Sequence, residues 1–216
     1  MKRSVKKVLF FSGAILGVVF ALCVWYAAPV RAEVIAGDLP VIRVYNNEGE
    51  PINISLEDAG KYHGDICPCL VFTYRAIQSA VERLWEGEIP YRSDMRMITR
   101  SKSCGARDAF EFVARAVTRP ERKGDFRIEP PEEKKPNMEI NDFVFIFIRK
   151  STNDRLEVRV KDSVFPEGFL RMKKKRESGL LTPREKEMFN KAKLELKRKA
   201  VSLPPEELFT FKEIKK

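Results

Sequence analysis

The stretch LVFTYRAIQSAVERLW, residues 70–85, decides how this chain folds. Its apolar side chains recur every three or four residues, which is the spacing of one face of an α-helix. They are Leu70, Tyr74, Ile77, Val81 and Leu84, with Ala80 beside them. The spacing predicts a long amphipathic helix, and the other apolar segments of the chain have to pack against it.

Short apolar segments elsewhere in the chain predict a small sheet. Residues 143–148 are apolar on both faces, which indicates a central strand that is covered on each side. Residues 156–160 alternate between apolar and polar side chains after a turn at residues 152–154, so they predict a second strand in a hairpin. Residues 41–44 and 95–99 are further strand candidates.

Two other helices are marked by their first residues. Ser55 and Asp58 have the spacing of a capping box, in which each side chain bonds the other residue's backbone amide. They predict a short helix. Thr182, Pro183 and Glu185 combine such a box with proline at the first helical position, and they predict a helix that runs to about residue 200.

The remaining signals complete an α+β fold. Residues 106–117 have a helical pattern, whereas residues 118–141 predict a loop because they are rich in proline and charge. Helices packed on a small, mostly antiparallel sheet make an α+β domain. We expect one such domain over residues 55–213, preceded by an extended segment at residues 33–54 and by a separate segment at residues 1–32.

This first segment has the features of an export signal. Residues 1–7 are basic, residues 8–30 have no charged side chain, and Val30-Arg31-Ala32 offers a cleavage site. The apolar run is also long enough to span a bilayer. We expect either a signal peptide cleaved after Ala32 or an uncleaved membrane anchor. In both cases the rest of the chain is exported and faces the bacterial periplasm.

Charge is distributed unevenly along the chain. It has 41 lysines and arginines against 31 aspartates and glutamates, for a net charge of +10. Residues 1–32 hold five of these basic residues and no acidic one, and residues 171–199 hold 12 against 4 glutamates. The remainder is nearly neutral, which argues against nucleic-acid binding. We expect the basic segment 171–199 to be a solvated helix, with weak contact to an anionic membrane surface or an acidic partner as the alternative.

Thiol and imidazole side chains gather in two short segments. His63, Cys67 and Cys69 lie within seven residues just before the long helix, and Cys104 opens a second loop. Imidazole and thiolate are common ligands of zinc and other transition metals, and a helix N-terminus stabilises a thiolate. If the two loops meet, His63, Cys67 and Cys104 form a three-ligand site with an open position. Cys69 and Asp108 are further candidate ligands.

Other interpretations of these residues stay open. In an oxidising compartment the cysteines can form a structural disulfide, with His63 on the surface. A thiol–disulfide redox protein would use Cys67 and Cys69, with His63 lowering a thiol pKa and Cys104 as the resolving thiol. A Cys-Pro pair can also supply an axial thiolate to haem, but nothing else in the sequence supports haem.

The segment KYHGDICP, residues 61–68, followed by Tyr74-Arg75-Ala76, resembles the signature of the FmdE-like family, which is named after a component of formylmethanofuran dehydrogenase. That signature is a His-Gly-x-x-Cys-Pro-Gly turn that leads into a helix. Residues 103–109, SCGARDA, are similar to the family's Cys-x-x-x-Asp-Ala segment, and residues 204–209 are similar to its closing Pro-Glu-Glu-Leu-Phe. The resemblance covers roughly residues 55–213.

The resemblance implies a dimeric α+β core with a cleft in which His63, Cys67 and Cys104 can hold zinc. It does not imply formylmethanofuran chemistry, because many members share only this core. The sequence departs from the family at Cys69, where the family has glycine, and at residues 118–124, where its second cysteine is absent. The expected function is that of an exported metal-binding protein, with no substrate or reaction assigned.

Overall fold

The computed structural model of the chain describes residues 39–129 and 143–214. These residues belong to one compact unit, Val34–Lys216, and the predicted export segment at residues 1–32 lies outside them. Across the described ranges, no helix is long and apolar enough to cross a membrane.

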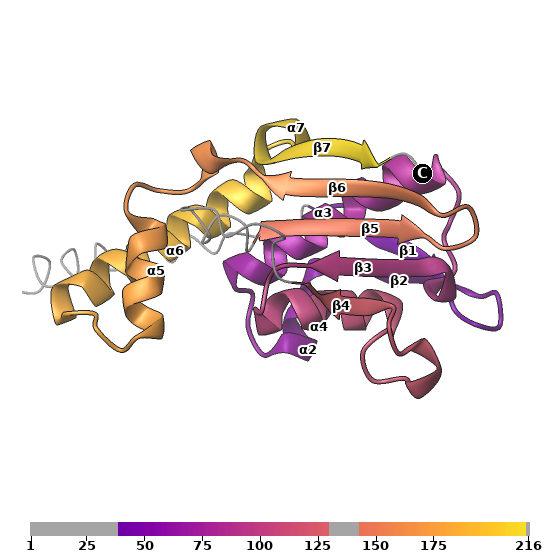
Figure 1. The fold of residues 1–216 in the computed structure, drawn as a ribbon, viewed down its shortest axis with the longest axis horizontal. Coiled ribbons are helices and arrows are strands. Elements are labelled where there is room, and N and C mark those ends of the chain that lie inside the picture. The colour runs from indigo at the N-terminus through magenta and orange to yellow at the C-terminus, as the bar shows by residue number, and fades with distance from the viewer. Residues whose placement is uncertain (1–38, 130–142, 215–216) are drawn as a thin grey trace, which may run out of the picture. The chain divides into compact units, whose positions relative to one another are not determined.

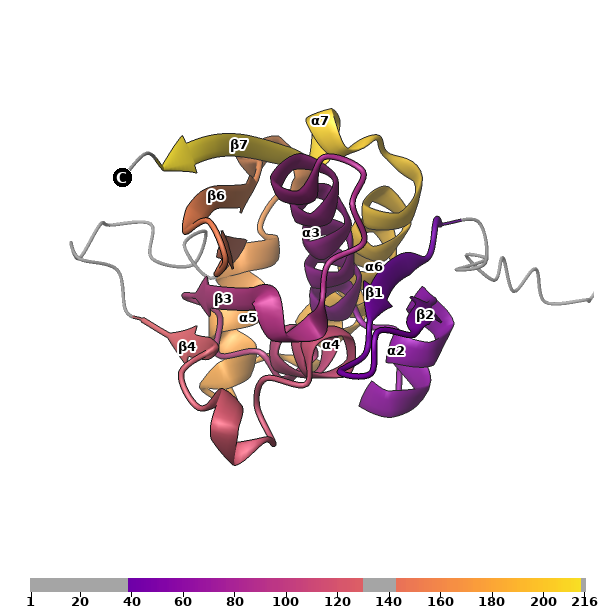
Figure 2. The same cartoon turned by 90° about the vertical axis from the view of Figure 1, so that its right-hand side faces the viewer.

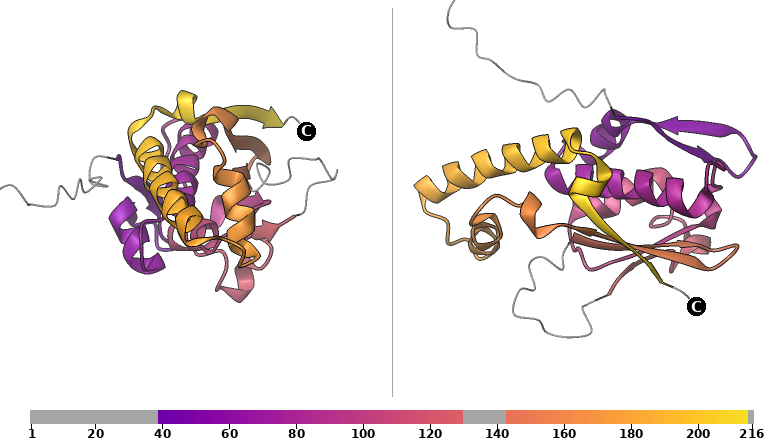
Figure 3. Two further views of the ribbon diagram at one scale, coloured as in Figure 1. Left: turned by 90° about the vertical axis from the view of Figure 1, so that its left-hand side faces the viewer. Right: turned by 90° about the horizontal axis from the view of Figure 1, so that it is seen from above.

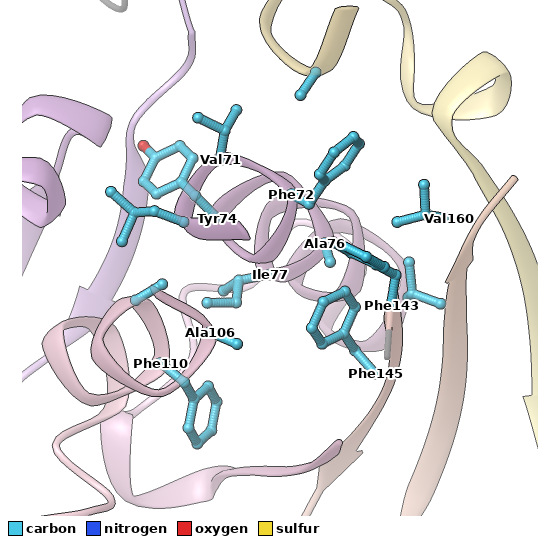
Figure 4. Packing of buried hydrophobic residues seen from close by; sticks show 14 of the residues in the cluster. Val71, Phe72, Tyr74, Ala76, Ile77, Ala106, Phe110, Phe143, Phe145 and Val160 are labelled. Atoms are coloured by element: carbon cyan, nitrogen blue, oxygen red, sulfur yellow. The ribbon is translucent and has the colours of Figure 1, made fainter. Parts of the chain in front are cut away.

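Helix α3 (Pro68–Trp85) runs through the centre of this unit and corresponds to the helix predicted at residues 70–85. Figure 4 shows its side chains meeting neighbours on several sides. Every residue from 70 to 77 is buried, so the first half of the helix is covered all round. The amphipathic pattern predicted from the sequence describes only the last turns, where Glu82 and Arg83 are exposed. A helix enclosed by other elements has no solvent face, which is why its first half departs from that pattern.

A five-stranded sheet covers one side of α3 (Figure 1). Its strands, in the order β4-β3-β5-β6-β7, are Phe126–Ile128, Met95–Thr99, Val144–Arg149, Asp154–Val160 and Phe209–Ile214. The middle strand is β5, which confirms the central strand predicted at residues 143–148. Among these strands β3 and β4 pair in parallel, and the other neighbours are antiparallel.

Two strands of this sheet were not predicted. Strand β4 lies within the expected loop at residues 118–141, of which residues 130–142 fall in the part that is not described. Its three residues are too few to show a period, and a parallel partner supplies their backbone hydrogen bonds. Strand β7 follows the short helix α7 (Pro205–Leu208) and pairs with β6, so the chain returns to the sheet after its last helices.

A second layer covers the opposite side of α3 (Figures 2 and 3). It consists of a hairpin, β1 (Ile42–Tyr45) with β2 (Pro51–Ile54), and of helix α2 (Leu56–His63). The capping box predicted at Ser55 is present, because its side chain accepts from the Asp58 amide and the Asp58 carboxylate accepts from the Ser55 amide.

Helix α4 (Cys104–Ala114) lies beside α3 and starts two residues earlier than the predicted helix at residues 106–117. It ends early because Arg115 adopts a left-handed conformation with φ of 55°. Single 3₁₀ turns occur at Arg92–Asp94, Pro120–Arg122 and Asp162–Val164.

The basic segment at residues 171–199 forms two helices and not the single helix that we expected. They are α5 (Phe169–Glu177) and α6 (Pro183–Ser202), and Gly179 turns the chain between them with φ of 71°. The capping box at Thr182 is present, as predicted. Glu195 and Lys199 form an ion pair of 2.9 Å, which agrees with the expected solvated helix face.

A buried ionic network joins the sheet to the end of α4. Asp125 accepts from Arg122 Nε at 2.5 Å, from Lys150 Nζ at 2.8 Å and from Arg96 Nε at 3.1 Å. The other nitrogens of Arg122 donate to the carbonyl groups of Ala114 and Met95. Burial alone would raise the pKa of Asp125, but its bonds with Lys150 and Arg122 outweigh burial and lower that pKa.

Replacing Asp125 with asparagine should lower the free energy of unfolding by about 3 kcal/mol at pH 7, because it leaves Arg122 as a buried charge without its partner. Since the pKa of Asp125 is lowered on folding, its contribution is present above pH 4 and is lost as the pH falls through the folded-state value. Urea denaturation at pH 7 and pH 3 measures both effects. Asp162→Asn, at an exposed position, is the control. If the parent protein and Asp125→Asn differed in stability as much at pH 3 as at pH 7, this account would be contradicted.

Candidate metal centre

A tight turn between α2 and α3 brings His63 next to Cys67. Helix α2 ends at Gly64, which is left-handed with φ of 99°, a conformation that glycine adopts without strain. Cys67 then caps α3, because its Sγ accepts a hydrogen bond from the Leu70 amide at 3.4 Å. As a result, His63 Nε2 lies 3.5 Å from Cys67 Sγ.

A residue of helix α4 binds the other nitrogen of the imidazole ring. Asp108 Oδ2 lies 2.8 Å from His63 Nδ1, and both side chains are largely buried. An ionised carboxylate can only accept, so the proton is on Nδ1 and the neutral ring presents a lone pair at Nε2. Asp108, a candidate ligand in the sequence, therefore lies on the ring nitrogen away from Cys67 and orients the imidazole, as carboxylates do behind many metal-bound histidines.

The pKa of His63 reflects these neighbours. Burial alone would lower it, but the bond to Asp108 and the nearby Cys67 outweigh burial, and the pKa is raised. The site therefore favours a positive charge on or beside the ring.

A third donor comes from Asp65, in the turn itself. Its Oδ1 lies 3.4 Å from His63 Nε2, and the donor atoms of His63, Asp65 and Cys67 all lie within 4.8 Å of one another. This brings together a carboxylate, a sulfur and a ring nitrogen that all carry lone pairs, an arrangement that a cation would stabilise. Asp65 was not among the ligands predicted from the sequence. The sequence signal that could have identified it is its position as a carboxylate between His63 and Cys67.

The other two cysteines lie close by but outside this group. Cys67, Cys69 and Cys104 all have free thiols. Cys69 is half-buried beside Cys67, whereas Cys104 is the exposed first residue of α4 and is not among the three donors within 4.8 Å. The described geometry thus joins His63 to Cys67 directly and leaves Cys104, which the sequence predicted as a ligand, outside the group of three donors.

Cys67 and Cys69 affect each other's ionisation. The hydrogen bond between their side chains lowers the pKa of Cys69 to about 7 and raises that of Cys67. The two thiols therefore titrate as a coupled pair. The Leu70 amide and the positive end of α3 are placed to stabilise a thiolate at Cys67.

Gly105 allows the two helix starts to meet. A Cβ atom at this position would lie 2.9 Å from the Leu70 nitrogen and 3.0 Å from Cys67 Sγ. Glycine at the second position of α4 is therefore what lets this helix approach the N-terminus of α3 and places Asp108 on His63.

Tyr74 and Arg75, which follow in the family signature, have structural roles. The Tyr74 hydroxyl donates to the Ile54 carbonyl at 2.8 Å, and the Arg75 guanidinium donates to the Leu203 carbonyl at 2.8 Å, just beyond the end of α6. Both side chains are buried, and these bonds tie α3 to the elements around it.

The donor set fits zinc. Zinc binds imidazole nitrogen, thiolate sulfur and carboxylate oxygen at about 2.0–2.3 Å, which places neighbouring donors about 3–4 Å apart. The separations of 3.5 Å and 3.4 Å from His63 Nε2 lie in this range. Three protein ligands would leave a fourth position open, as in catalytic zinc sites.

Gly105→Ala should lower the free energy of unfolding by about 1–3 kcal/mol, because the added methyl group clashes with backbone and sulfur. Helix propensity alone predicts the opposite sign, a gain of about 1 kcal/mol. Chemical denaturation of the metal-free protein distinguishes the two. Cys104→Ala, at the preceding exposed position, should have little effect, and a Gly105→Ala variant as stable as the parent would refute the close approach.

A family comparison agrees with this geometry. The family model described as FmdE, Molybdenum formylmethanofuran dehydrogenase operon, matches residues 62–210. The match takes in the turn that carries His63 and Cys67, the central helix α3 and the start of β7. A comparison with curated proteins gives no match. Because the family model matches well over half of the chain, the chain belongs to the FmdE family.

Proposed function

We propose that this protein is an exported metal-binding protein that holds zinc through His63, Cys67 and Asp65. The observation that carries the proposal is the position of His63, whose Nδ1 is held by Asp108 while Nε2 lies 3.5 Å from Cys67 Sγ. A histidine held in this way has its ligand nitrogen oriented in advance, which reduces the cost of binding a metal.

The chemistry of the donors supports zinc over the hard cations. Magnesium and calcium prefer oxygen ligands, whereas the thiol and imidazole favour zinc or another borderline transition metal. A zinc ion with an open position would supply Lewis acidity to a bound water or substrate. The chain's own contribution is to orient His63 through Asp108 and to hold the Cys67 sulfur at the positive end of α3.

Cys67→Ser should remove most of the bound zinc while leaving the fold intact. Serine is among the preferred N-cap residues, so the variant keeps a cap on α3 and loses only the thiolate. Cys69→Ser, two residues along, is the matched control and should keep most of the metal. The measurement is zinc per chain, by mass spectrometry of protein purified without added metal.

The same measurement assigns the third ligand. Loss of zinc in Asp65→Asn but not in Cys104→Ala would support the described geometry, and the reverse would mean that Cys104 moves into the site when the metal binds. A parent protein that contains no metal, and that gains less than one zinc per chain on addition of zinc to the reduced form, would overturn the proposal.

Thiol–disulfide exchange is the second candidate, and the presence of three free thiols, two of them hydrogen-bonded to each other, favours it. A redox protein would cycle between Cys67 and Cys69, or pass the disulfide to Cys104, without holding a metal. Titration of free thiols before and after mild oxidation separates the two candidates. Thiols that stay reduced and are protected from alkylation by zinc would favour the metal centre.

Export should depend on residues 1–32, whose basic start and uncharged run motivate this part of the proposal. An alkaline phosphatase that is active only outside the cytoplasm, fused after Ala32, should be active in a bacterial host. Deletion of residues 8–30 is the control and should abolish that activity. An inactive fusion with the full segment would contradict export.

A further inference from the structure

A polar pocket of about 390 Å³ lies at the opposite end of α4 from the candidate metal centre. The turn between β1 and β2, the segment before β3 and the segment after α4 meet there (Figure 1). Helix α4 has 11 residues, so its ends are about 16 Å apart at 1.5 Å per residue. The pocket is therefore separate from the metal centre. Its lining includes Tyr91, Arg92, Arg115, Arg119 and Arg122.

Two of these arginines are positioned by the end of α4. Arg122 uses its nitrogens in the network with Asp125 and in bonds to two carbonyl groups. Arg92 donates from Nη2 to the Phe112 carbonyl at 3.1 Å. Its Nε, however, is buried and has no hydrogen-bond partner among the described residues. A buried donor without an acceptor is unfavourable.

Arg115 and Arg119 have guanidinium groups with only loose ion pairs. The nearest carboxylate oxygens lie at 3.9 Å from Arg115, on Glu111, and at 3.6 Å from Arg119, on Glu121. Both side chains are about half exposed, at 44% and 48%. Arg115, which lines the pocket, is also the residue that ends α4 in the left-handed conformation.

Three carboxylates lie near these arginines, and each is either bonded to other groups or exposed to solvent. Glu111 is buried, and its oxygens accept from the Val117 amide at 2.6 Å and from the Thr118 hydroxyl at 2.5 Å. Glu48 and Glu121 also line the pocket, but both are exposed. Burial lowers the pKa of Arg92, the charges of Arg115 and Arg119 lower it further, and the charge of Glu111 offsets these effects only in part. An anion between the three arginines would relieve that repulsion.

We propose that this pocket binds a small organic oxyanion through Arg92, Arg115 and Arg119. The guanidinium fork matches the paired oxygens of a carboxylate or a phosphate, which are the groups we expect the ligand to carry. Tyr91, whose ring contacts that of Tyr45 at 5.1 Å between centroids, offers an apolar wall for the rest of the molecule. This proposal does not depend on the proposed metal centre.

The test uses inorganic phosphate and succinate as probes, because both chelate metals weakly. At low ionic strength either probe should raise the midpoint of thermal unfolding of the protein by a few degrees relative to chloride at equal ionic strength. Titration calorimetry should show binding that weakens at least tenfold in Arg115→Gln and in Arg119→Gln. Both residues are half exposed, so these variants should fold. Arg83→Gln, at an exposed position on α3, is the matched control and should bind like the parent.

Cys67→Ser separates this pocket from the metal centre, and binding of the probe should be unchanged in that variant. A response to phosphate alone or to succinate alone supports the pocket and identifies the group it prefers. The proposal is overturned if neither probe exceeds the chloride effect, if both arginine variants bind like the parent, or if Cys67→Ser abolishes binding.

Discussion

The complete burial of the first half of α3 is the constraint on which the rest of this structure depends. A helix without a solvent face must have neighbours on every side, and the chain supplies them from a sheet, a hairpin and three other helices. Its polar side chains also need partners inside the protein. Thr73 and Ser79 therefore donate to carbonyl groups of α3 itself, and Arg75 donates to carbonyl groups at the end of α6.

The same constraint makes the N-terminus of α3 a fixed point. Cys67 and the turn before it cannot move without disturbing a packed core. His63 therefore lies against a sulfur whose position is fixed by the start of α3. Asp108 then orients the ring from a second helix. Rigid elements therefore position each of the groups that the site needs except Asp65, which lies exposed in the turn.

Much of the fold could be predicted from the sequence because its signals are local. Each capping box, at Ser55 and at Thr182, marks the start of its own helix, and the apolar run of β5 marks a central strand. Strands β4 and β7 were missed because distant partners stabilise them, and no pattern within three or six residues reveals such a partner. The turn at Gly179 was overlooked because the charge on either side of it is continuous.

The candidate site was also predictable only where its residues are close together in the sequence. His63 and Cys67 are four residues apart, so a turn suffices to join them, whereas the bond from Asp108 spans 45 residues and only the fold can supply it. The three arginines at the far end of α4 give no sequence signal, because Arg92 joins the other two only through the packing of β3 beside α4.

Gly105 has a consequence for protein engineering. A designer who wished to tune the proposed metal preference of this candidate centre could exchange donors at Asp65, which is exposed, or at Cys69, which lies outside the group of three donors. Position 105 offers no such freedom, because even a methyl group meets the backbone of α3 and the sulfur of Cys67. The residue with no side chain is thus the least exchangeable member of this candidate centre, although it would offer a metal no ligand.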